Sequence, residues 1–174
     1  MIKPVENQKG IALIELLVAI ALTAIISTAA AMAIHQVITI VPRNNDQNTA
    51  INQVRNANHW LNFDIQSATP GSINDNPTAP KFLSMEQLEW ESGTGNWTTH
   101  TVDYSLEDMA GSSLKVLRRY YDSGVAGTLI ARYIDPANTN CSWNSTEKML
   151  TMNITAQVGT RTETRTFEVK PRPD

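Results

Sequence analysis

The sequence contains few of the residues that build metal centres and disulfide frameworks. Cys141 is the single cysteine among 174 residues, so an intrachain disulfide and a zinc site with several thiolate ligands are both excluded. The three histidines, His35, His59 and His100, do not have the spacing of metal ligands. We therefore expect the protein to hold no metal and no cofactor.

Charged residues are also few, and neither sign dominates. Fourteen Lys and Arg residues stand against 17 Asp and Glu residues, which gives a net charge of −3. Bulk binding to nucleic acid requires a clear basic excess, so we expect no directly bound nucleic acid. The length fits one domain of ordinary size, or a small domain with an anchor.

Motifs for catalysis are weak. Residues 112–115 and 145–148 both match the pattern S-x-x-K, but neither S-D-N nor K-T-G accompanies them. We therefore predict that the protein has no catalytic residues and is not an enzyme. The other candidates have plain structural interpretations: a solvated turn for 74–76, core packing for Trp60 and Phe63, solvation for Arg118 and Arg119, and an unpaired, partly shielded thiol for Cys141.

Most of the strongly apolar sequence lies in one segment near the N-terminus. The 19 residues from Leu16 to Ile34 carry no charge, and the apolar run extends to Val41. As a helix, a stretch of this length crosses about 30 Å of hydrocarbon. Lys3 and Lys9 precede it. The positive-inside tendency therefore predicts a cytoplasmic N-terminus and places residues from about Arg43 onward outside.

Three interpretations of this segment compete. Small residues at 29–33 are compatible with a secretory signal peptide, and the length is compatible with a plain signal anchor. The third interpretation accounts for Glu15, whose carboxylate would cost roughly 2.5–3.5 kcal/mol at the bilayer centre and less near the interface. If the chain is cut after Gly10, the new α-amine of Ile11 provides a cation at similar depth for Glu15 of a neighbouring subunit.

Residues 9–20, KGIALIELLVAI, closely resemble the class III signal of type IV prepilins and pseudopilins. The resemblance implies that a prepilin peptidase cuts between Gly10 and Ile11 on the cytoplasmic face and then methylates the amine of Ile11. It also implies that Glu15 is the assembly acid. The first mature residue would be Ile11, where the family most often has Phe.

Beyond the membrane segment, the sequence predicts a second stretch of helix. Pro42 removes one hydrogen-bond donor and disfavours helix at Val41, so we expect a kink or a short break there. Apolar residues then recur every three or four positions, which predicts one buried face of a helix from about Asn45 to Ser67. The stripe consists of Ile51, Val54, Asn58, Leu61, Ile65 and Ala68.

The rest of the chain has the pattern of β-strands. Five apolar residues alternate with polar ones between Leu150 and Val158, which indicates a half-buried strand. Gly159–Thr160 fits a two-residue hairpin turn, and the polar segment from Arg161 to Val169 fits an edge strand. Three further strands are expected. One lies near 101–106, in a second strand residues 114, 116, 118 and 120 share one face, and in a third strand residues 129, 131 and 133 share one face. We predict an α+β fold with a long N-terminal helix on an antiparallel sheet.

The resemblance and the predicted elements together imply a domain organisation and a set of partners. The plan is a cytoplasmic leader at 1–10, a transmembrane segment at 11–42, an amphipathic continuation at 43–69 and a β-rich domain outside the cytoplasm at 70–174. The implied partners are the prepilin peptidase, other minor and major pilins or pseudopilins, and the lipid of the inner membrane.

The order of apolar patches between residues 50 and 170 is similar to that in J-type minor pseudopilins and W-type minor pilins. This second resemblance implies a structural or initiating subunit of a type IV pilus-like filament, in type II secretion, competence or a type IV pilus. The alternative is a membrane-anchored or secreted binding module outside the cytoplasm, reached through an ordinary signal sequence.

Overall fold

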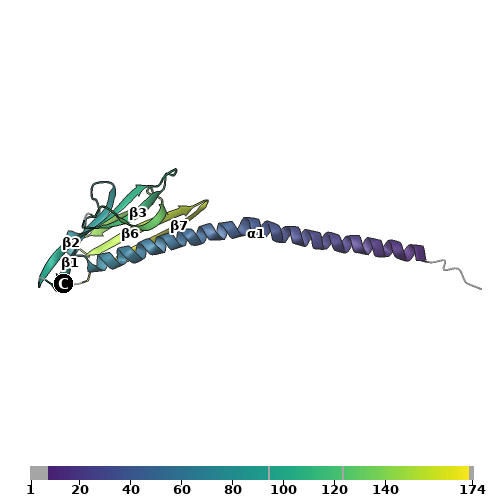
Figure 1. Ribbon diagram of the computed structural model, residues 1–174, viewed down its shortest axis with the longest axis horizontal. Helices are drawn as coiled ribbons and strands as arrows, with labels where there is room; N and C mark the ends of the chain where they lie inside the picture. The colour runs from purple at the N-terminus through teal and green to yellow at the C-terminus, as the bar shows by residue number, and fades with distance from the viewer. Residues whose placement is uncertain (1–7, 94, 123, 173–174) are drawn as a thin grey trace, which may run out of the picture. The chain divides into compact units, whose positions relative to one another are not determined.

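The computed structural model describes residues 8–93, 95–122 and 124–172, with side chains described from Leu13 onward (Figure 1). The chain divides into two compact units, the first ending at Asn44 and the second beginning at Asn45. Helix α1 (Gln8–Ser67) supplies residues to both units, and the short 3-10 helix η1 (Pro70–Ser72) follows it. The remaining regular elements are strands.

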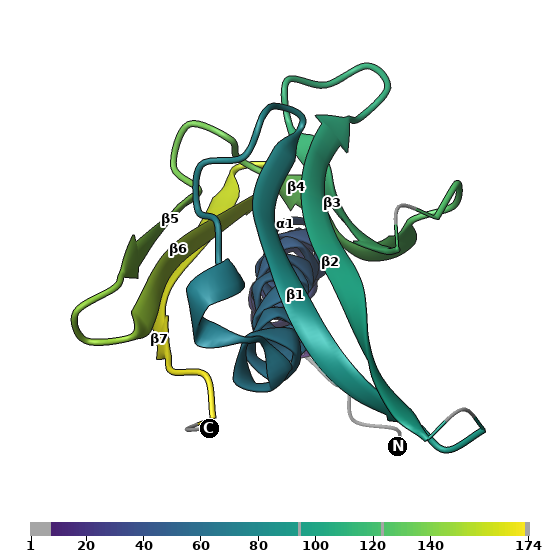
Figure 2. The ribbon, with the colours of Figure 1, turned by 90° about the vertical axis from the view of Figure 1, so that its left-hand side faces the viewer.

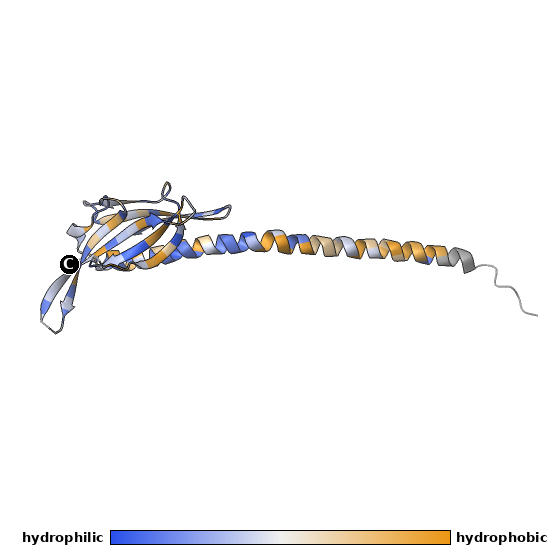
Figure 3. Cartoon of the chain, turned by 45° about the horizontal axis from the view of Figure 1, so that its top comes forward, coloured by the Kyte–Doolittle hydropathy of each residue, from blue (hydrophilic) through white to orange (hydrophobic). Residues whose placement is uncertain are grey.

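The first unit consists of the apolar part of α1. Every side chain from Leu13 to Ile38 is exposed, although most of them are apolar, and Figure 3 shows this stretch as mostly orange ribbon. The hydroxyl groups of Thr23 and Thr28 donate to carbonyl oxygens one turn earlier, at 2.9 and 2.6 Å. Hydroxyl groups that are satisfied within their own helix are suited to a hydrocarbon environment.

Pro42 lies inside α1 rather than at a break. The helix continues from Gln8 to Ser67 without interruption, so the short break that we considered at Pro42 does not occur. A proline inside a helix removes one backbone hydrogen bond and disfavours helical geometry at the preceding residue. The helical residues on both sides outweigh this local preference, and Val41 is helical as well.

The second unit contains residues 45–67 of α1 packed against a curled antiparallel sheet of seven strands (Figure 2). The strands pair in the order β1-β2-β3-β4-β6-β5, and β7 pairs with β6. Their bounds are β1 Lys81–Glu91, β2 Asn96–Asp108, β3 Lys115–Tyr121, β4 Thr128–Ile134, β5 Asn140–Asn144, β6 Met149–Val158 and β7 Arg161–Val169. The predicted α+β fold class is therefore confirmed.

One face of α1 is buried against the sheet, at positions that recur every three or four residues: Ala50, Val54, Ala57, Leu61, Ile65 and Ala68. The predicted stripe was right at its larger aliphatic residues, and the helix ends at Ser67 as predicted. It was wrong at Ile51 and Asn58, which are only half-buried, because Ala50 and Ala57 take the contact instead. Small side chains let the helix backbone approach the sheet more closely than Ile or Asn would.

The predicted β6–β7 hairpin is confirmed. The apolar residues of β6 from Leu150 to Ala156 are buried at alternate positions. Gly159 has a φ of 56°, and Val158 pairs with Arg161, so the turn contains two residues with glycine at the first central position. In the described residues β7 pairs only with β6, which makes it an edge strand as its polar sequence predicted.

One strand departs from the predicted alternation, and another keeps it. In β3 the core-facing side chain is Leu117, and Val116, Arg118 and Tyr120 share the opposite face, as the alternation predicted. In β4 the buried residues are Ile130, Ala131 and Ile134, because the pairing of β3 with β4 shifts register and Tyr133 adopts a φ of 61°. An irregularity of this kind resets the two-residue period, and sequence alternation alone does not reveal it.

A buried carboxylate connects α1 to three strands. The side chain of Asp64 is completely buried on α1 and lies in an ion pair with Arg119 of β3, at 2.6 Å between Oδ2 and Nε. Arg119 Nη2 donates to Oδ1 at 2.9 Å, and the Tyr104 hydroxyl on β2 donates to Oδ2 at 2.5 Å. The side-chain amide of Gln87 on β1 donates to the Asp64 carbonyl oxygen at 3.0 Å and to the carboxylate oxygen Oδ1 at 3.3 Å. The expectation that Arg119 is solvated was wrong.

This network changes the acid–base properties of its members. The hydrogen bond to Asp64 raises the pKa of Arg119, and burial followed by the charge of Asp64 raises the pKa of Tyr104 far above its usual value. Both groups therefore keep their protons across the physiological range. Arg119 Cζ also lies 5.5 Å from the ring centre of Trp60, a cation–π distance.

We predict that Arg119→Met destabilises the domain much more than Lys115→Met, which removes another cation from the same strand. Arg119→Met leaves a buried carboxylate without its cation, and we expect a loss of about 3–5 kcal/mol in the free energy of unfolding. Lys115 pairs with Asp108, whose side chain is 93% exposed, so its loss should be about 0–1 kcal/mol. Urea unfolding of the detergent-solubilised chain, followed by tryptophan fluorescence, measures both, and equal small losses would contradict the role assigned to Arg119.

Candidate functional site

The candidate site is the N-terminal stretch of α1 around Glu15. Glu15 is exposed, and so are the side chains beside it, with Ile14 at 62% and Leu16 at 61%. The helix therefore presents a carboxylate surrounded by uncovered apolar side chains. A surface of this kind is suited to lipid or to another apolar helix, and the carboxylate needs a cationic partner in either place.

The two residues at the predicted cleavage position are also in α1. Gly10 and Ile11 are helical, and their side chains are not among those that the structure describes. The leader residues 1–7, including Lys3, lie outside the described residues. Cleavage and methylation at this position therefore stay predictions from the sequence.

The apolar part of α1 meets the requirements for a membrane span. Within the described residues, α1 is one helix that is long and apolar enough to cross a bilayer, and the qualifying stretch is near the N-terminus. Its apolar window is exposed in this chain, which distinguishes it from the buried core helix of a soluble domain. Length and composition thus agree with a single membrane anchor.

Comparison with known proteins identifies this stretch. Residues 6–31 match the family model described as the prokaryotic N-terminal methylation motif. The N-terminal stretch therefore carries the signal of the type IV prepilin and pseudopilin family. The match includes Gly10, Ile11 and Glu15, and it ends before the folded domain begins. No curated protein and no solved structure matches the chain significantly.

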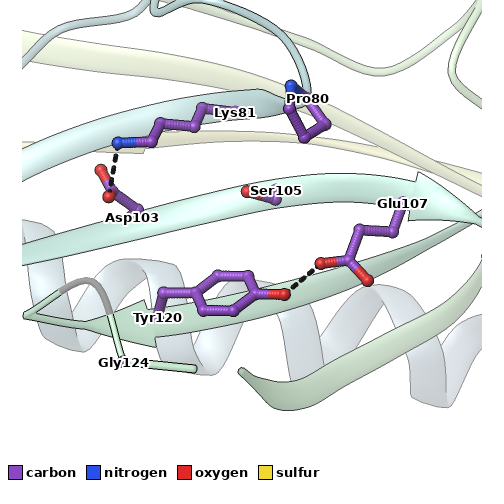
Figure 4. A pocket seen from close by; sticks show the side chains of 7 residues that line it. All are labelled: Pro80, Lys81, Asp103, Ser105, Glu107, Tyr120 and Gly124. Atoms are coloured by element: carbon purple, nitrogen blue, oxygen red, sulfur yellow. Dashed lines mark hydrogen bonds and ion pairs between the residues drawn. The ribbon is translucent and has the colours of Figure 1, made fainter. Parts of the chain in front are cut away.

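The folded domain that follows this stretch has a pocket of about 270 Å³ on the face of the sheet opposite α1 (Figure 4). Lys81 Nζ lies 2.7 Å from Asp103 Oδ2, and the Tyr120 hydroxyl donates to Glu107. Glu107 also pairs with Arg118, at 3.2 Å between Oε2 and Nε. The charged side chains of the pocket therefore neutralise one another, and none of them has the environment of an activated nucleophile.

The residues that matched S-x-x-K perform structural roles at 112–115. Ser112 Oγ accepts a hydrogen bond from the Leu114 amide at 3.1 Å within a turn, and Lys115 pairs with Asp108. Among the described residues, no group of three or more His, Cys, Asp or Glu side chains is placed to hold a metal ion.

Cys141 is a shielded thiol. Its Sγ lies 3.4 Å from the carbonyl oxygen of Phe82 and 3.6 Å from that of Asp75. Burial, and secondly the charge of Asp75, raise the pKa of Cys141 to about 12. Because the thiolate is the reactive form, Cys141 is a poor nucleophile at neutral pH. The Asp75 carboxylate, which the sequence placed in a solvated turn, accepts the Trp143 amide at 2.8 Å.

Two ion pairs of the folded domain could not be predicted from the sequence. Asp64 lies at helical spacing on the apolar face of α1, between Leu61 and Ala68. An acid at such a position indicates that a cation is paired with it in the core, and this was the one sequence signal for the pair. His100 and Asp122 gave no sequence signal because they are distant in the chain. In the structure His100 Nδ1 lies 2.6 Å from Asp122 Oδ2.

The His100–Asp122 pair holds the start of the β3–β4 loop. The Asp122 carboxylate also accepts the Thr101 amide at 2.9 Å, and its own amide donates to the Thr101 carbonyl at 2.8 Å. The hydrogen bond to Asp122 is the main cause that raises the pKa of His100, and the same bond lowers the pKa of Asp122. Both members of the pair are therefore charged at pH values between the lowered pKa of Asp122 and the raised pKa of His100.

The signs of these shifts predict the pH dependence of the pair. The contribution of His100 to stability is complete below the unfolded pKa of about 6.5 and is lost as the pH rises through the raised folded value. That of Asp122 is lost as the pH falls through its lowered pKa, below 3.8. We expect Asp122→Asn to lower the pKa of His100 in an NMR titration of the imidazole.

The matched control for this titration is Asp108→Asn. Asp108 is another exposed acid, at the end of β2, and it pairs with Lys115. This substitution should leave the His100 titration unchanged, because Asp108 is not among the groups that act on His100. An unchanged His100 pKa in Asp122→Asn would show that the pair does not form in solution.

Proposed function

We propose that this chain is a minor pilin or pseudopilin, a structural subunit that helps to start a type IV pilus-like filament. The observation that carries the proposal is the methylation motif at residues 6–31, with Glu15 on an exposed apolar helix. A folded β-rich domain at the C-terminal end of the same helix supports it. The order of apolar patches between residues 50 and 170 is similar to that in J-type minor pseudopilins and W-type minor pilins, and it favours one of these two types.

The proposed processing follows from the position of Gly10. A prepilin peptidase removes residues 1–10 at the cytoplasmic face and methylates the new amine of Ile11. A cutting site beside the membrane requires a small residue before the scissile bond, which Gly10 supplies. The mature protein is a single-pass protein of the inner membrane, and its folded domain lies in the periplasm or outside the cell. The basic residues Lys3 and Lys9 support this orientation.

The proposed assembly step uses the charge of Glu15. In a low-dielectric setting a lone carboxylate is strongly penalised, whereas a carboxylate that faces the α-amine of another chain is largely compensated. Ile11 and Glu15 are four residues apart, about 6 Å along a helix. The amine of one subunit can therefore meet Glu15 of a neighbour that is displaced along the helix axis. Other pilins or pseudopilins with the same helix are the partners.

We predict that Glu15→Leu is still cleaved and stays in the membrane but is recruited poorly into filaments. Leucine removes the cost of placing a carboxylate in the membrane, so insertion is unaffected. It also removes the ion pair with the neighbouring amine, so crosslinking to neighbouring subunits should fall about tenfold or more. A tenfold fall corresponds to about 1.4 kcal/mol. Crosslinking from positions 11 to 18 to co-expressed pilin subunits measures recruitment. Glu15→Asp should be intermediate, because the charge remains but the reach shortens.

The matched control is Thr23→Leu, which replaces another polar side chain on the same helix. The Thr23 hydroxyl donates to a carbonyl oxygen of its own helix at 2.9 Å, so its loss should not change recruitment. If Glu15→Leu retains normal crosslinks and filament numbers, Glu15 does not have the assembly role proposed here.

A further inference from the structure

The end of the domain at which α1 finishes carries two adjacent hollows. The first, of about 430 Å³, is lined by Leu88 and Trp97 together with the last residues of α1 and Arg172. The second, of about 500 Å³, is lined by Trp143 and Lys148 with the segment that follows α1. Thr69 lines both, so the two hollows are neighbours. Figure 2 views the domain from this end.

Each hollow combines a tryptophan with a cation. The Trp97 side chain is 66% exposed, and the Trp90 ring supports it edge-on, with ring centres 5.5 Å apart. Trp143 is half-buried, and its backbone is fixed by the hydrogen bond to Asp75. Rigid aromatic side chains lose little conformational entropy on binding and are enriched at the centres of protein interfaces.

The two cations are exposed and lack acidic partners within the described part of the chain. Neither Arg172 nor Lys148 forms an ion pair there, although acidic residues outnumber basic ones in the sequence. The Arg172 amide donates to the carbonyl oxygen of Gln66 at 3.1 Å, which holds the C-terminal segment against the end of α1. The described residues that line the two hollows thus include two cations and no acid, an arrangement that complements carboxylates.

We infer that this end of the domain is a docking surface for an acidic segment of a partner protein. An aliphatic or aromatic side chain of the segment packs on Trp97 and Leu88, and its carboxylates pair with Arg172 and Lys148. A folded protein segment fits better than nucleic acid, because phosphate binding depends on clusters of Lys and Arg that this surface does not have. Aromatic residues and arginine are both enriched at the centres of protein interfaces.

The position of the surface fits a subunit held by its N-terminal helix, a point that rests on the proposed function. Residues 45–67 of α1 extend about 33 Å at 1.5 Å per residue. The hollows lie at the Ser67 end of this stretch, and the chain enters the domain at its Asn45 end. The surface and the connection to the first unit therefore lie at opposite ends of residues 45–67.

The experiment uses the full chain in a neutral detergent and two fluorescein-labelled peptides, measured by fluorescence anisotropy at low salt. The acidic peptide is Gly-Asp-Glu-Phe-Asp-Leu-Glu-Gly, and in the second peptide every acid is replaced by its amide. We expect saturable binding of the acidic peptide below about 1 mM and at least tenfold weaker binding of the amide peptide. Absence of saturable binding up to 1 mM would overturn the inference.

Variants locate the binding. We expect Trp97→Ala to weaken binding at least tenfold, and Arg172→Gln and Lys148→Gln to weaken it about fivefold each. The matched control is Arg161→Gln, an exposed cation at the β6–β7 turn, which should bind as the unaltered chain does. Equal binding by the three site variants would overturn the inference. So would tighter binding of polygalacturonate with the same dependence on Trp97, because the partner would then be an acidic polysaccharide.

This binding does not require cleavage at Gly10 or pairing of Glu15. Failure of the peptide experiment therefore leaves the proposed assembly function standing, and failure of the Glu15 experiment leaves the docking surface standing.

Discussion

The buried contact between Asp64 and Arg119 is the interaction on which the rest of the domain depends. Asp64 lies on the apolar face of α1, and its groups are bound by Arg119 on β3, Tyr104 on β2 and Gln87 on β1. Apolar packing alone tolerates rotation and sliding of a helix on a sheet, because dispersion and burial are not directional. A carboxylate that must meet donors from three strands fixes both the rotation and the axial position of α1, because a shift would leave a buried charge unpaired.

This constraint divides α1 into two stretches with different roles. Residues 45–67 bury an apolar face and have their one buried acid fully paired, so they belong to the domain core. Residues 13–41 have exposed apolar side chains and an exposed Glu15, so their partners must come from outside the chain. The same rule, that an acid in an apolar setting requires a cation, applies to both stretches. Asp64 meets its cation within the fold, and in the proposed filament Glu15 meets its cation on a neighbouring subunit.

Sequence reasoning predicted the parts of this protein that local pattern determines. The methylation motif, the end of α1 at Ser67 and the β6–β7 hairpin are all set by residues close together in the chain. It could not predict that Arg119 is half-buried and paired with Asp64, because this partner is 55 residues away and exposed arginines give the same pattern. The left-handed backbone at Tyr133 and the use of Ala50 in place of Ile51 depend on strand pairing and close packing, which alternation and spacing do not encode. The docking surface also joins residues from several parts of the chain.

The mature N-terminus of the protein tests the central claim most directly. The intact chain would be purified from membranes of cells that contain a prepilin peptidase, and its mass and N-terminal sequence determined, beside a Gly10→Val variant. The account predicts a chain that begins at Ile11, with or without a methyl group on its amine, and an uncut variant. A chain that begins between Ala31 and Ile34 would indicate an ordinary signal peptide, and with it the whole account of α1 as an assembly helix would be wrong.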